Sequence, residues 1–300
     1  MKTKQKEISI KSLVNNFSIE TTPNVYTKYG NFTKFLNHKN SVYVTYLPDE
    51  ESQRVIDTSK KLNEEGFRAV PHLPARTFKN NSHLEKYVGN LSEIAGCKEI
   101  LVIGGGGNQN GNITSSLDVL KTDLLSKFNF TKVGLAGHPE GNPDVSDKEL
   151  DKAIIEKNKF AKNVDYTMYL VTQFFFEASS LQKWEKHLDS LNNSLDIHAG
   201  IPGPASLKIL ISYATSCGIF NSIRFLSKQA LNITKLATAR TPDKLIADLA
   251  DYKYSHPYSK LSKLHFYAFG GIKKTSEWLN LVNDFPLDIN SDNEFEPIKD

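Results

Sequence analysis

Short apolar runs alternate with longer amphipathic runs along almost the whole chain. Runs such as Val42–Thr45 and Glu99–Ile103 are rich in β-branched and aromatic residues and have the length of strands. A longer run, Asp49–Glu65, opens with acids and stops at Gly66, as a helix does. The pattern therefore predicts strand–helix pairs that follow one another through the chain.

Each predicted strand is followed by a stretch that is long enough for a helix. The predicted strands are Phe17–Glu20, Val42–Thr45, Phe67–His72, Glu99–Ile103, Lys132–Ala136, a sixth that ends at Gln173, a weak seventh at Leu195–Ala199, and Lys263–Ala268. The predicted helices are a stretch to His38, then Asp49–Glu65, Ser82–Ala95, Ser115–Phe128, Asp147–Lys162, Leu181–Leu191, Ala205–Ser216, Ile219–Leu231, Thr241–Asp251 and Thr275–Asn283.

Strand–helix units repeated eight times over 300 residues are typical of a (β/α)8 barrel. We predict an α/β protein with a single TIM-barrel domain at residues 1–283 and a loosely held acidic tail at residues 284–300. A doubly wound open sheet is the alternative. The number of units and the lack of a glycine fingerprint after the first strand count against it.

Composition and charge narrow the class of protein. Hydrophobic residues make up 39% of the chain, enough for a sizeable core, and no apolar run is long enough to span a membrane. The charged start lacks an apolar signal segment, so we expect a cytoplasmic protein. A net charge of +3, with lysines scattered among acids, argues against nucleic-acid binding. Cys97 and Cys217 lack metal-ligand spacing, so no metal site is predicted.

Polar residues and glycines stand where the predicted strands end, which is where TIM barrels carry their chemistry. Their joint placement predicts a ligand mouth for something large and flat. The residues are Glu20, Thr45, His72, the Gly104–Gly107 run, His138, Gln173, the Gly200-Ile201-Pro202 turn and Tyr267.

Glu20 and Gln173 have the most specific candidate roles in this set. The Gln173 amide could grip a planar heterocycle that offers donors and acceptors side by side, or it could be capped by backbone. Glu20 could be a general acid whose pKa is raised in a closed site, or the N-cap of the next helix. His72 could hydrogen-bond a ligand or be a satisfied, half-buried imidazole.

The other candidates also have two readings each. Gly104–Gly107 fits neither a dinucleotide fingerprint nor a Walker loop, so it allows close approach to a ligand or is a flexible turn. Lys162 could meet a pyrophosphate or be solvated at a helix end, and Tyr213 could stack on a ligand or pack against the barrel.

Four motifs, in this order, resemble methylenetetrahydrofolate reductase. The resemblance runs from Glu20 to about Gly271, and the Thr-Gln-Phe-Phe-Phe-acid run within it is highly specific. The chain looks like the short bacterial-type catalytic barrel, without the regulatory domain of the animal enzymes. The motifs are Gly134–Pro143, Thr172–Glu177, Gly200–Pro202 and His265–Tyr267.

The resemblance implies a flavin-dependent interconversion of 5,10-methylenetetrahydrofolate and 5-methyltetrahydrofolate, with FAD as cofactor and NADH or NADPH as electron partner. Glu20 would protonate the folate so that its imidazolidine ring opens to an iminium, and Gln173 would bind folate and help to position the nicotinamide. Tyr213 matches an aromatic residue that packs on folate. Residues on or near the family's FAD contacts are Thr45, His72, His138 (usually Tyr), Asn142 (usually His), Asn158 and Lys162.

One departure from the family lies after the fourth strand. The family usually reads Leu-Arg-Gly-Asp there, with the Asp close to the flavin, and this chain reads Ile103-Gly104-Gly105-Gly106. Loss of a negative charge beside the flavin should raise its potential and favour oxidation of 5-methyltetrahydrofolate. A flavin-free variant and a non-redox folate- or pterin-binding barrel remain as alternatives. The sequence does not choose between NADH and NADPH, and it is compatible with a homo-oligomer.

Overall fold

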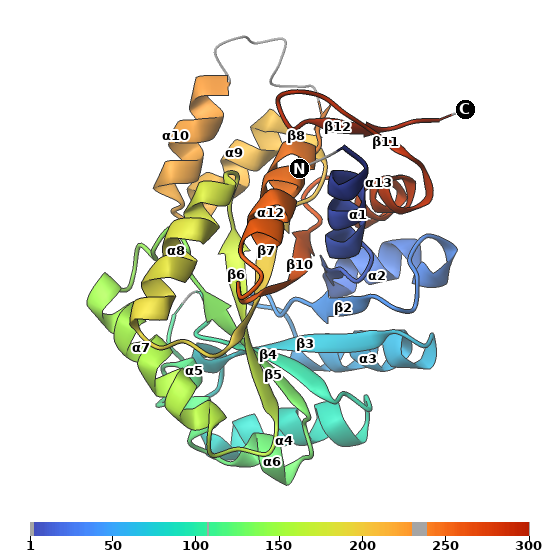
Figure 1. The fold of residues 1–300 in the computed structure, drawn as a ribbon. Helices are drawn as coiled ribbons and strands as arrows, with labels where there is room; N and C mark the ends of the chain where they lie inside the picture. The colour runs from blue at the N-terminus through green and yellow to red at the C-terminus, as the bar shows by residue number, and fades with distance from the viewer. Residues whose placement is uncertain (1–2, 107, 230–238, 300) are drawn as a thin grey trace.

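The structure is a computed structural model that describes residues 3–106, 108–229 and 239–299. Eight parallel strands close into a barrel in the order β1-β10-β7-β6-β5-β4-β3-β2, with helices around them (Figure 1). The (β/α)8 barrel expected from the sequence is therefore confirmed. The barrel strands are β1 (Ser18–Thr21), β2 (Ser41–Val44), β3 (Arg68–Pro74), β4 (Glu99–Ile103), β5 (Lys132–Gly137), β6 (Thr167–Phe174), β7 (Asp196–Pro202) and β10 (Leu261–Tyr267).

Helices form the outer layer, and two small two-stranded sheets are separate from the barrel. None of the helices in the described ranges is long and apolar enough to cross a membrane. The helices are α1 (Thr3–Val14), α2 (Pro23–Tyr29), η1 (Phe32–Lys34), α3 (Ser52–Glu64), η2 (Ala75–Thr77), α4 (Asn81–Glu93), α5 (Ser116–Leu120), α6 (Leu124–Lys127), α7 (Asp147–Ala161), α8 (Ala178–Ser190), α9 (Leu207–Ser216), α10 (Phe220–Gln229), α12 (Asp243–Ser255) and α13 (Ile272–Asp284). The small sheets pair β8 (Ala205–Ser206) with β9 (Ala239–Arg240), and β11 (Leu287–Ile289) with β12 (Phe295–Pro297).

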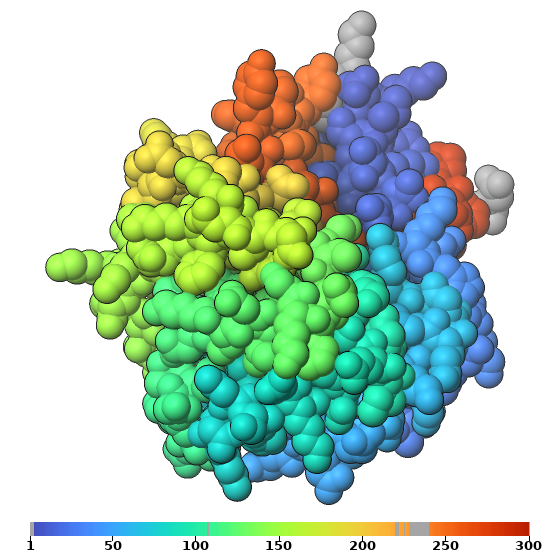
Figure 2. Space-filling view, turned by 90° about the horizontal axis from the view of Figure 1, so that it is seen from below, coloured from blue at the N-terminus to red at the C-terminus, as the bar shows by residue number. Residues whose placement is uncertain are grey.

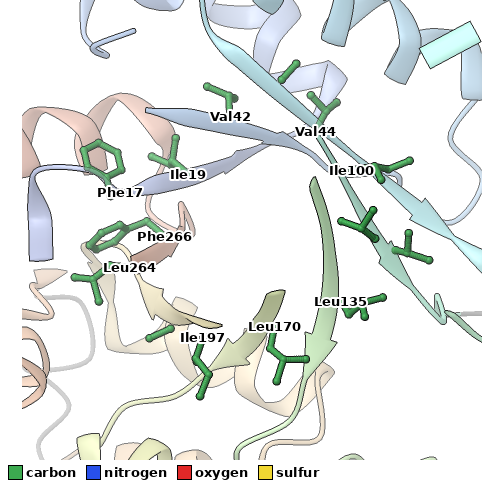
Figure 3. Packing of buried hydrophobic residues seen from close by; sticks show 14 of the residues in the cluster. Phe17, Ile19, Val42, Val44, Ile100, Leu135, Leu170, Ile197, Leu264 and Phe266 are labelled. Carbon is green, nitrogen blue, oxygen red and sulfur yellow. The ribbon is translucent and has the colours of Figure 1, made fainter. Parts of the chain in front are cut away.

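The two faces of the barrel strands differ in polarity, because successive side chains of a strand point to opposite sides. Figure 3 shows Val42, Leu135 and Phe266 on the outer side of the ring of strands, where they belong to the core shared with the helices. On β1, Ile19 joins this core, whereas Ser18 and Glu20 contact His265 across the interior. The interior therefore carries polar groups at the level where the ligand mouth was expected.

A packed layer of side chains closes the barrel beneath these polar groups. Tyr43, Val70, Leu101, Tyr169 and Val171 form one buried cluster. Within it, the hydroxyl groups of Tyr43 and Tyr169 lie 2.8 Å apart and hydrogen-bond each other. The layer satisfies its own polar atoms and forms a floor, so that a ligand can enter only from the carboxyl ends of the strands.

Two helical segments differ from the sequence prediction. Helix α1 was not predicted, because only Lys6, Ile10 and Val14 of its twelve residues are buried and its other positions are too polar to show a periodic apolar stripe. The single helix expected over Ser115–Phe128 is two short helices, since Asp123 between them has a left-handed φ of 55°. The end predicted for α10 at Leu231 lies outside the described residues.

The C-terminal segment is not the loosely held tail that its composition suggested. Its β11–β12 hairpin buries Leu287 and Phe295, and the Phe295 ring stacks on Trp278 of α13 with centroids 6.2 Å apart. The backbone N–H of Phe295 donates to Asp243 of α12. The hairpin also contacts α1, so that the first and last segments lie side by side (Figures 1 and 2).

Replacing Phe295 by alanine tests whether the hairpin belongs to the folded unit. Because this buried ring packs on α13, we expect Phe295→Ala to lower the free energy of unfolding by about 3 kcal/mol. Ile298→Ala, at a position that is 47% exposed, is the control and should change it by less than about 0.5 kcal/mol. Urea denaturation measures both, and equal midpoints for the two variants would show that the segment is loosely held after all.

Candidate functional site

The carboxylate of Glu20 lies between two imidazoles at the carboxyl end of β1. Its Oε1 is 3.3 Å from Nε2 of His265 on β10 and 3.4 Å from Nε2 of His72 on β3. His265 has the geometry of a hydrogen bond, whereas Nε2 of His72 has none and is buried without another partner among the described residues. The Glu20 side chain is 17% exposed, whereas the His265 side chain is fully buried, so Glu20 is the more accessible of the two.

The two imidazoles decide the charge of Glu20. Burial alone would raise its pKa, but the hydrogen bond from His265 and the proximity of His72 outweigh burial and lower the pKa to about 2. Burial lowers the pKa of His265, which therefore stays neutral at pH 7. The raised pKa that the sequence suggested for Glu20 is therefore wrong in this structure. The prediction considered burial of the carboxylate without the two histidines beside it.

Gln173 reaches the same mouth from the end of β6. Its Oε1 accepts a hydrogen bond from the backbone N–H of Phe174 at 3.2 Å. Cys217, on the turn between α9 and α10, connects it to Glu20: burial and the Glu20 charge raise the pKa of this thiol, and a hydrogen bond with Gln173 lowers it, with a net rise. Glu20 and Gln173 both stand near the carboxyl ends of parallel strands of one barrel, β1 and β6, and so lie on the same rim.

A series of aromatic rings leads from this region toward the surface. The hydroxyl of Tyr267 donates to the carbonyl of Thr172 at 2.9 Å, next to Gln173. Phe269 stacks on Tyr267 with an interplanar angle of 24° and on Tyr213 with an angle of 18°. Tyr213, which the family resemblance assigns to folate, thus packs on Phe269 and is 43% exposed.

A second cavity, of about 170 Å³, lies beside the ends of β4 and β5, and Arg76, Gly104, His138 and Lys157 are among the residues that line it. Lys157 is buried, and its Nζ donates to the carbonyl of Ala136 at 2.9 Å. It forms no ion pair with any described residue, and burial lowers its pKa to about 8. The pKa of His138 falls to about 4 through burial and the charge of Lys157.

The carboxylates in the wall of this cavity are already engaged. Glu149 accepts from the N–H and hydroxyl of Ser146, and Asp151 pairs with His187 at 2.7 Å. The basic side chains of the cavity are therefore left without a carboxylate partner, and the cavity fits an anionic group.

The glycine run after β4 has one position that requires glycine. Gly105 has φ 88°, and a Cβ there would lie 2.8 Å from Cβ of Pro74. A Cβ at Gly104 or Gly106 would meet nothing within 4 Å, so these two leave open space. Gly107 lies outside the described residues.

Two of the predicted cofactor contacts are not at the mouth. The buried amide of Asn158 bonds Asn193 at 3.0 Å and accepts from Ser194 N–H, in the loop that enters β7 from the opposite end of the barrel. Lys162 is exposed and caps the carboxyl end of α7, also at that end. The α7 lysine in the cavity is Lys157, which we missed. Lys157 follows the buried Ile154 by three residues, and this spacing could have placed it on the buried face of α7.

The remaining rim residues have structural partners. Thr45 is half-buried directly after β2, and its N–H donates to the carbonyl of Thr21 at 2.9 Å. Asn142 accepts from the N–H of Asp144 at 2.8 Å and so shapes the loop after β5. In the same loop, Glu140 accepts from Ser180 at 2.9 Å and from the Ser222 N–H at 3.0 Å, which fastens the loop to α8 and α10.

A larger hollow of about 1330 Å³ lies outside the barrel, between α8 and α12. Glu20 and Gln173 are absent from its lining. We therefore place the candidate chemistry in the mouth, where the buried ionisable groups converge, and not in this hollow.

The fold defines a TIM-barrel protein, and its candidate ligand site lies at the carboxyl ends of the strands. The sequence model of the family described as "Methylenetetrahydrofolate reductase" matches residues 24–261, and the chain belongs to this family. Gln173 lies within the matched range, and Glu20 lies just before it.

Comparison with solved structures gives two similar proteins. One is an uncharacterized protein from Clostridium thermocellum, described as binding two copies of 5-methyl-5,6,7,8-tetrahydrofolic acid: the TM-score is 0.56 at 12% identity, over 94% of this chain and 98% of that one. Dihydropteroate synthase from Thermus thermophilus matches with a TM-score of 0.47 at 10% identity, over 89% and 90% of the chains. At 12% identity, the first similarity establishes the fold alone.

The charge of Lys157 predicts an unusual dependence of stability on pH. Its pKa is about 8 in the folded protein and 10.5 in the ordinary exposed state, so burial of the charge costs about 3 kcal/mol below pH 8 and nothing above pH 10.5. We expect Lys157→Met to be more stable than the wild type at pH 7, with a gap that closes as the pH rises from 8 to 10.5.

Urea denaturation in phosphate-free buffer across this range measures the gap between the two proteins. Lys152→Met, on the exposed side of α7, is the control and should show no such change with pH. A gap for Lys157→Met that is independent of pH would contradict a buried, unpaired charge.

Proposed function

We propose that this protein is an oxidoreductase that interconverts 5-methyltetrahydrofolate and 5,10-methylenetetrahydrofolate at the barrel mouth. The observation that carries the proposal is the buried cluster of Glu20, His72 and His265, which lies at the same end of the barrel as Gln173. Membership of the reductase family supports the class of reaction. The folate described for the structurally similar Clostridium thermocellum protein supports the class of ligand.

The protein's own groups suit the recognition of a pterin. The amide of Gln173 offers a donor and an acceptor to the edge of the planar ring, and among the described residues its one backbone partner is the neighbouring N–H of Phe174. The aromatic series of Tyr267, Phe269 and Tyr213 offers an apolar wall for the p-aminobenzoyl part of the folate. A flat, partly polar ligand would match the polar and aromatic groups named here.

Glu20 handles the proton that the reaction gains or loses. When 5-methyltetrahydrofolate is oxidised, the imidazolidine ring closes and a folate N–H releases a proton, which an ionised carboxylate can accept. The low pKa of Glu20 keeps the carboxylate ionised, which is the protonation state that this role requires, and also makes it a weak base. In the reductive direction Glu20 must first gain a proton, so the charge of the cluster favours oxidation. The absence of a carboxylate at Gly104–Gly106 favours the same direction.

The cavity beside Gly104 fits part of a flavin cofactor. Lys157 and Arg76 would hold the pyrophosphate of FAD there, since their positive charge has no carboxylate partner in the cavity, and the neutral imidazole of His138 could add a hydrogen bond. FAD, when bound, supplies hydride transfer between the folate and NADH or NADPH. The visible spectrum of the protein after incubation with FAD distinguishes this version from a flavin-free enzyme.

A second candidate is a folate- or pterin-binding protein without redox chemistry. It is favoured by the same low pKa of Glu20, because a permanently ionised carboxylate is an acceptor for the N–H groups of a pterin and a poor proton donor. This candidate predicts tight folate binding by the wild type and no turnover in either direction.

The substitution Glu20→Gln tests the proposed function, since it keeps the shape of the side chain and removes its proton chemistry. We expect the interconversion of the two folates to fall by about 10²- to 10⁴-fold. Binding of 5-methyltetrahydrofolate and oxidation of NAD(P)H with an artificial acceptor should persist. Glu177→Gln, an exposed carboxylate at the start of α8, is the matched control and should keep full activity. Undiminished folate turnover in Glu20→Gln would refute the role of Glu20.

A further inference from the structure

Helices α9 and α10 pack side by side next to the end of β6 (Figure 1). Leu210 and Ala214 of α9 and Leu226 of α10 form an apolar cluster with Phe174 of β6, and none of these four residues belongs to the main core of the barrel. Phe174 directly follows Gln173, so this cluster stands at the rim. Contacts with neighbouring loops therefore contribute to the position of the two helices.

One carboxylate from the loop between β5 and α7 reaches two of the neighbouring helices. Oε2 of Glu140 accepts from the backbone N–H of Ser222 at 3.0 Å. Oε1 accepts from the hydroxyl of Ser222 at 3.0 Å and from the hydroxyl of Ser180 at 2.9 Å. Ser180 lies in the first turn of α8, and the buried Ser222 lies in the first turn of α10. Glu140 thus bonds an N–H that α10 leaves free, at the end of the helix where a negative charge is favourable.

The same loop also contacts the turn between α9 and α10. Gly218 in this turn has φ 65°, and a Cβ there would lie 2.6 Å from Cγ of Pro143. The loop and the turn are therefore in close contact, with no room for a side chain between them. Cys217 directly precedes Gly218 and interacts with Gln173. The loop that carries Glu140 is thus packed on the segment beside the Gln173 amide.

Helix α9 contributes an aromatic ring to the wall of the mouth. Tyr213 stacks on Phe269 with ring centroids 4.0 Å apart, and Phe269 stacks on Tyr267 with centroids 5.6 Å apart. These rings are the proposed wall for the p-aminobenzoyl part of folate. Because α9 and α10 pack on each other, a displacement of α10 also moves Tyr213.

We propose that Glu140 is a positioning residue for folate binding: it caps the first turn of α10 and so holds the α9–α10 pair, with Tyr213, at the mouth. The identity of the ligand rests on the proposed function. The hydrogen bonds of Glu140 to described residues go to Ser180 and Ser222, so it acts on the ligand site through the helices. Its loss should therefore weaken folate binding more than it slows the chemistry.

The position of the turn can be measured without a ligand, by alkylation of Cys217 with iodoacetamide. The chain has two cysteines, and Cys97 is 1% exposed, whereas Cys217 is only partly buried. We expect Cys217 to react at least about tenfold faster in Glu140→Ala than in the wild type, because the turn is released. Glu140→Gln should stay within about twofold of the wild type, since its amide can accept from the Ser222 N–H and donate to both hydroxyls.

Asp144→Ala is the matched control, because Asp144 is an exposed acid of the same loop, and its side chain bonds neither α8 nor α10 in the part of the chain that the structure describes. It should react at the wild-type rate. Mass spectrometry assigns the modified thiol, and continued protection of Cys97 separates release of the turn from global unfolding. Ser222→Ala removes one of the three hydrogen bonds and should give a smaller acceleration, which keeps the test open if Glu140→Ala does not fold.

The second measurement is the steady-state oxidation of 5-methyltetrahydrofolate. We expect Glu140→Ala to raise KM for the folate by about tenfold and to keep kcat within about threefold, and Glu140→Gln to restore KM. An unchanged alkylation rate of Cys217 or an unchanged folate KM in Glu140→Ala would overturn the proposal. Failure of the proposed function is separate: the wild type would then not turn over the folates, while the alkylation rates would still show whether Glu140 holds the turn.

Discussion

The structure depends on one electrostatic arrangement, a carboxylate held between two buried imidazoles at the carboxyl end of a barrel strand. A buried carboxylate is costly unless it is hydrogen-bonded or paired, and Glu20 has one hydrogen bond from His265 and a close second nitrogen from His72. Strands β1, β3 and β10 must close into a barrel for these groups to meet. The charge of Glu20 therefore depends on closure of the barrel.

The polar groups inside the barrel are arranged from a closed floor to an open mouth. In the floor, the hydroxyl groups of Tyr43 and Tyr169 hydrogen-bond each other, so neither needs Glu20 as a partner. Above the floor, Ser18 and His265 continue a line of hydrogen bonds that ends at the Glu20 carboxylate in the mouth. A proton released by a bound ligand thus meets an acceptor that is ready, which is the basis for our preference for the oxidative direction.

The alternation of apolar and amphipathic runs was sufficient to predict the barrel and the strand ends that carry Glu20, His72 and Gln173. It could not predict the sign of the Glu20 pKa shift, because His265 is near Glu20 only after the barrel closes. Counting residues along α7 also failed to separate Asn158 from Lys157, since neighbouring helix positions point in different directions and both residues are buried. Helix α1 and the C-terminal hairpin were missed because their apolar anchors are few and separated by charged residues.

The most direct measurement of the central claim is a crystal structure of the protein with 5-methyltetrahydrofolate. The account predicts the pterin ring in the barrel mouth, with its polar edge on Gln173 and its reacting nitrogens toward Glu20. A pterin bound only in the hollow between α8 and α12, with Glu20 and Gln173 not in contact with it, would contradict the account.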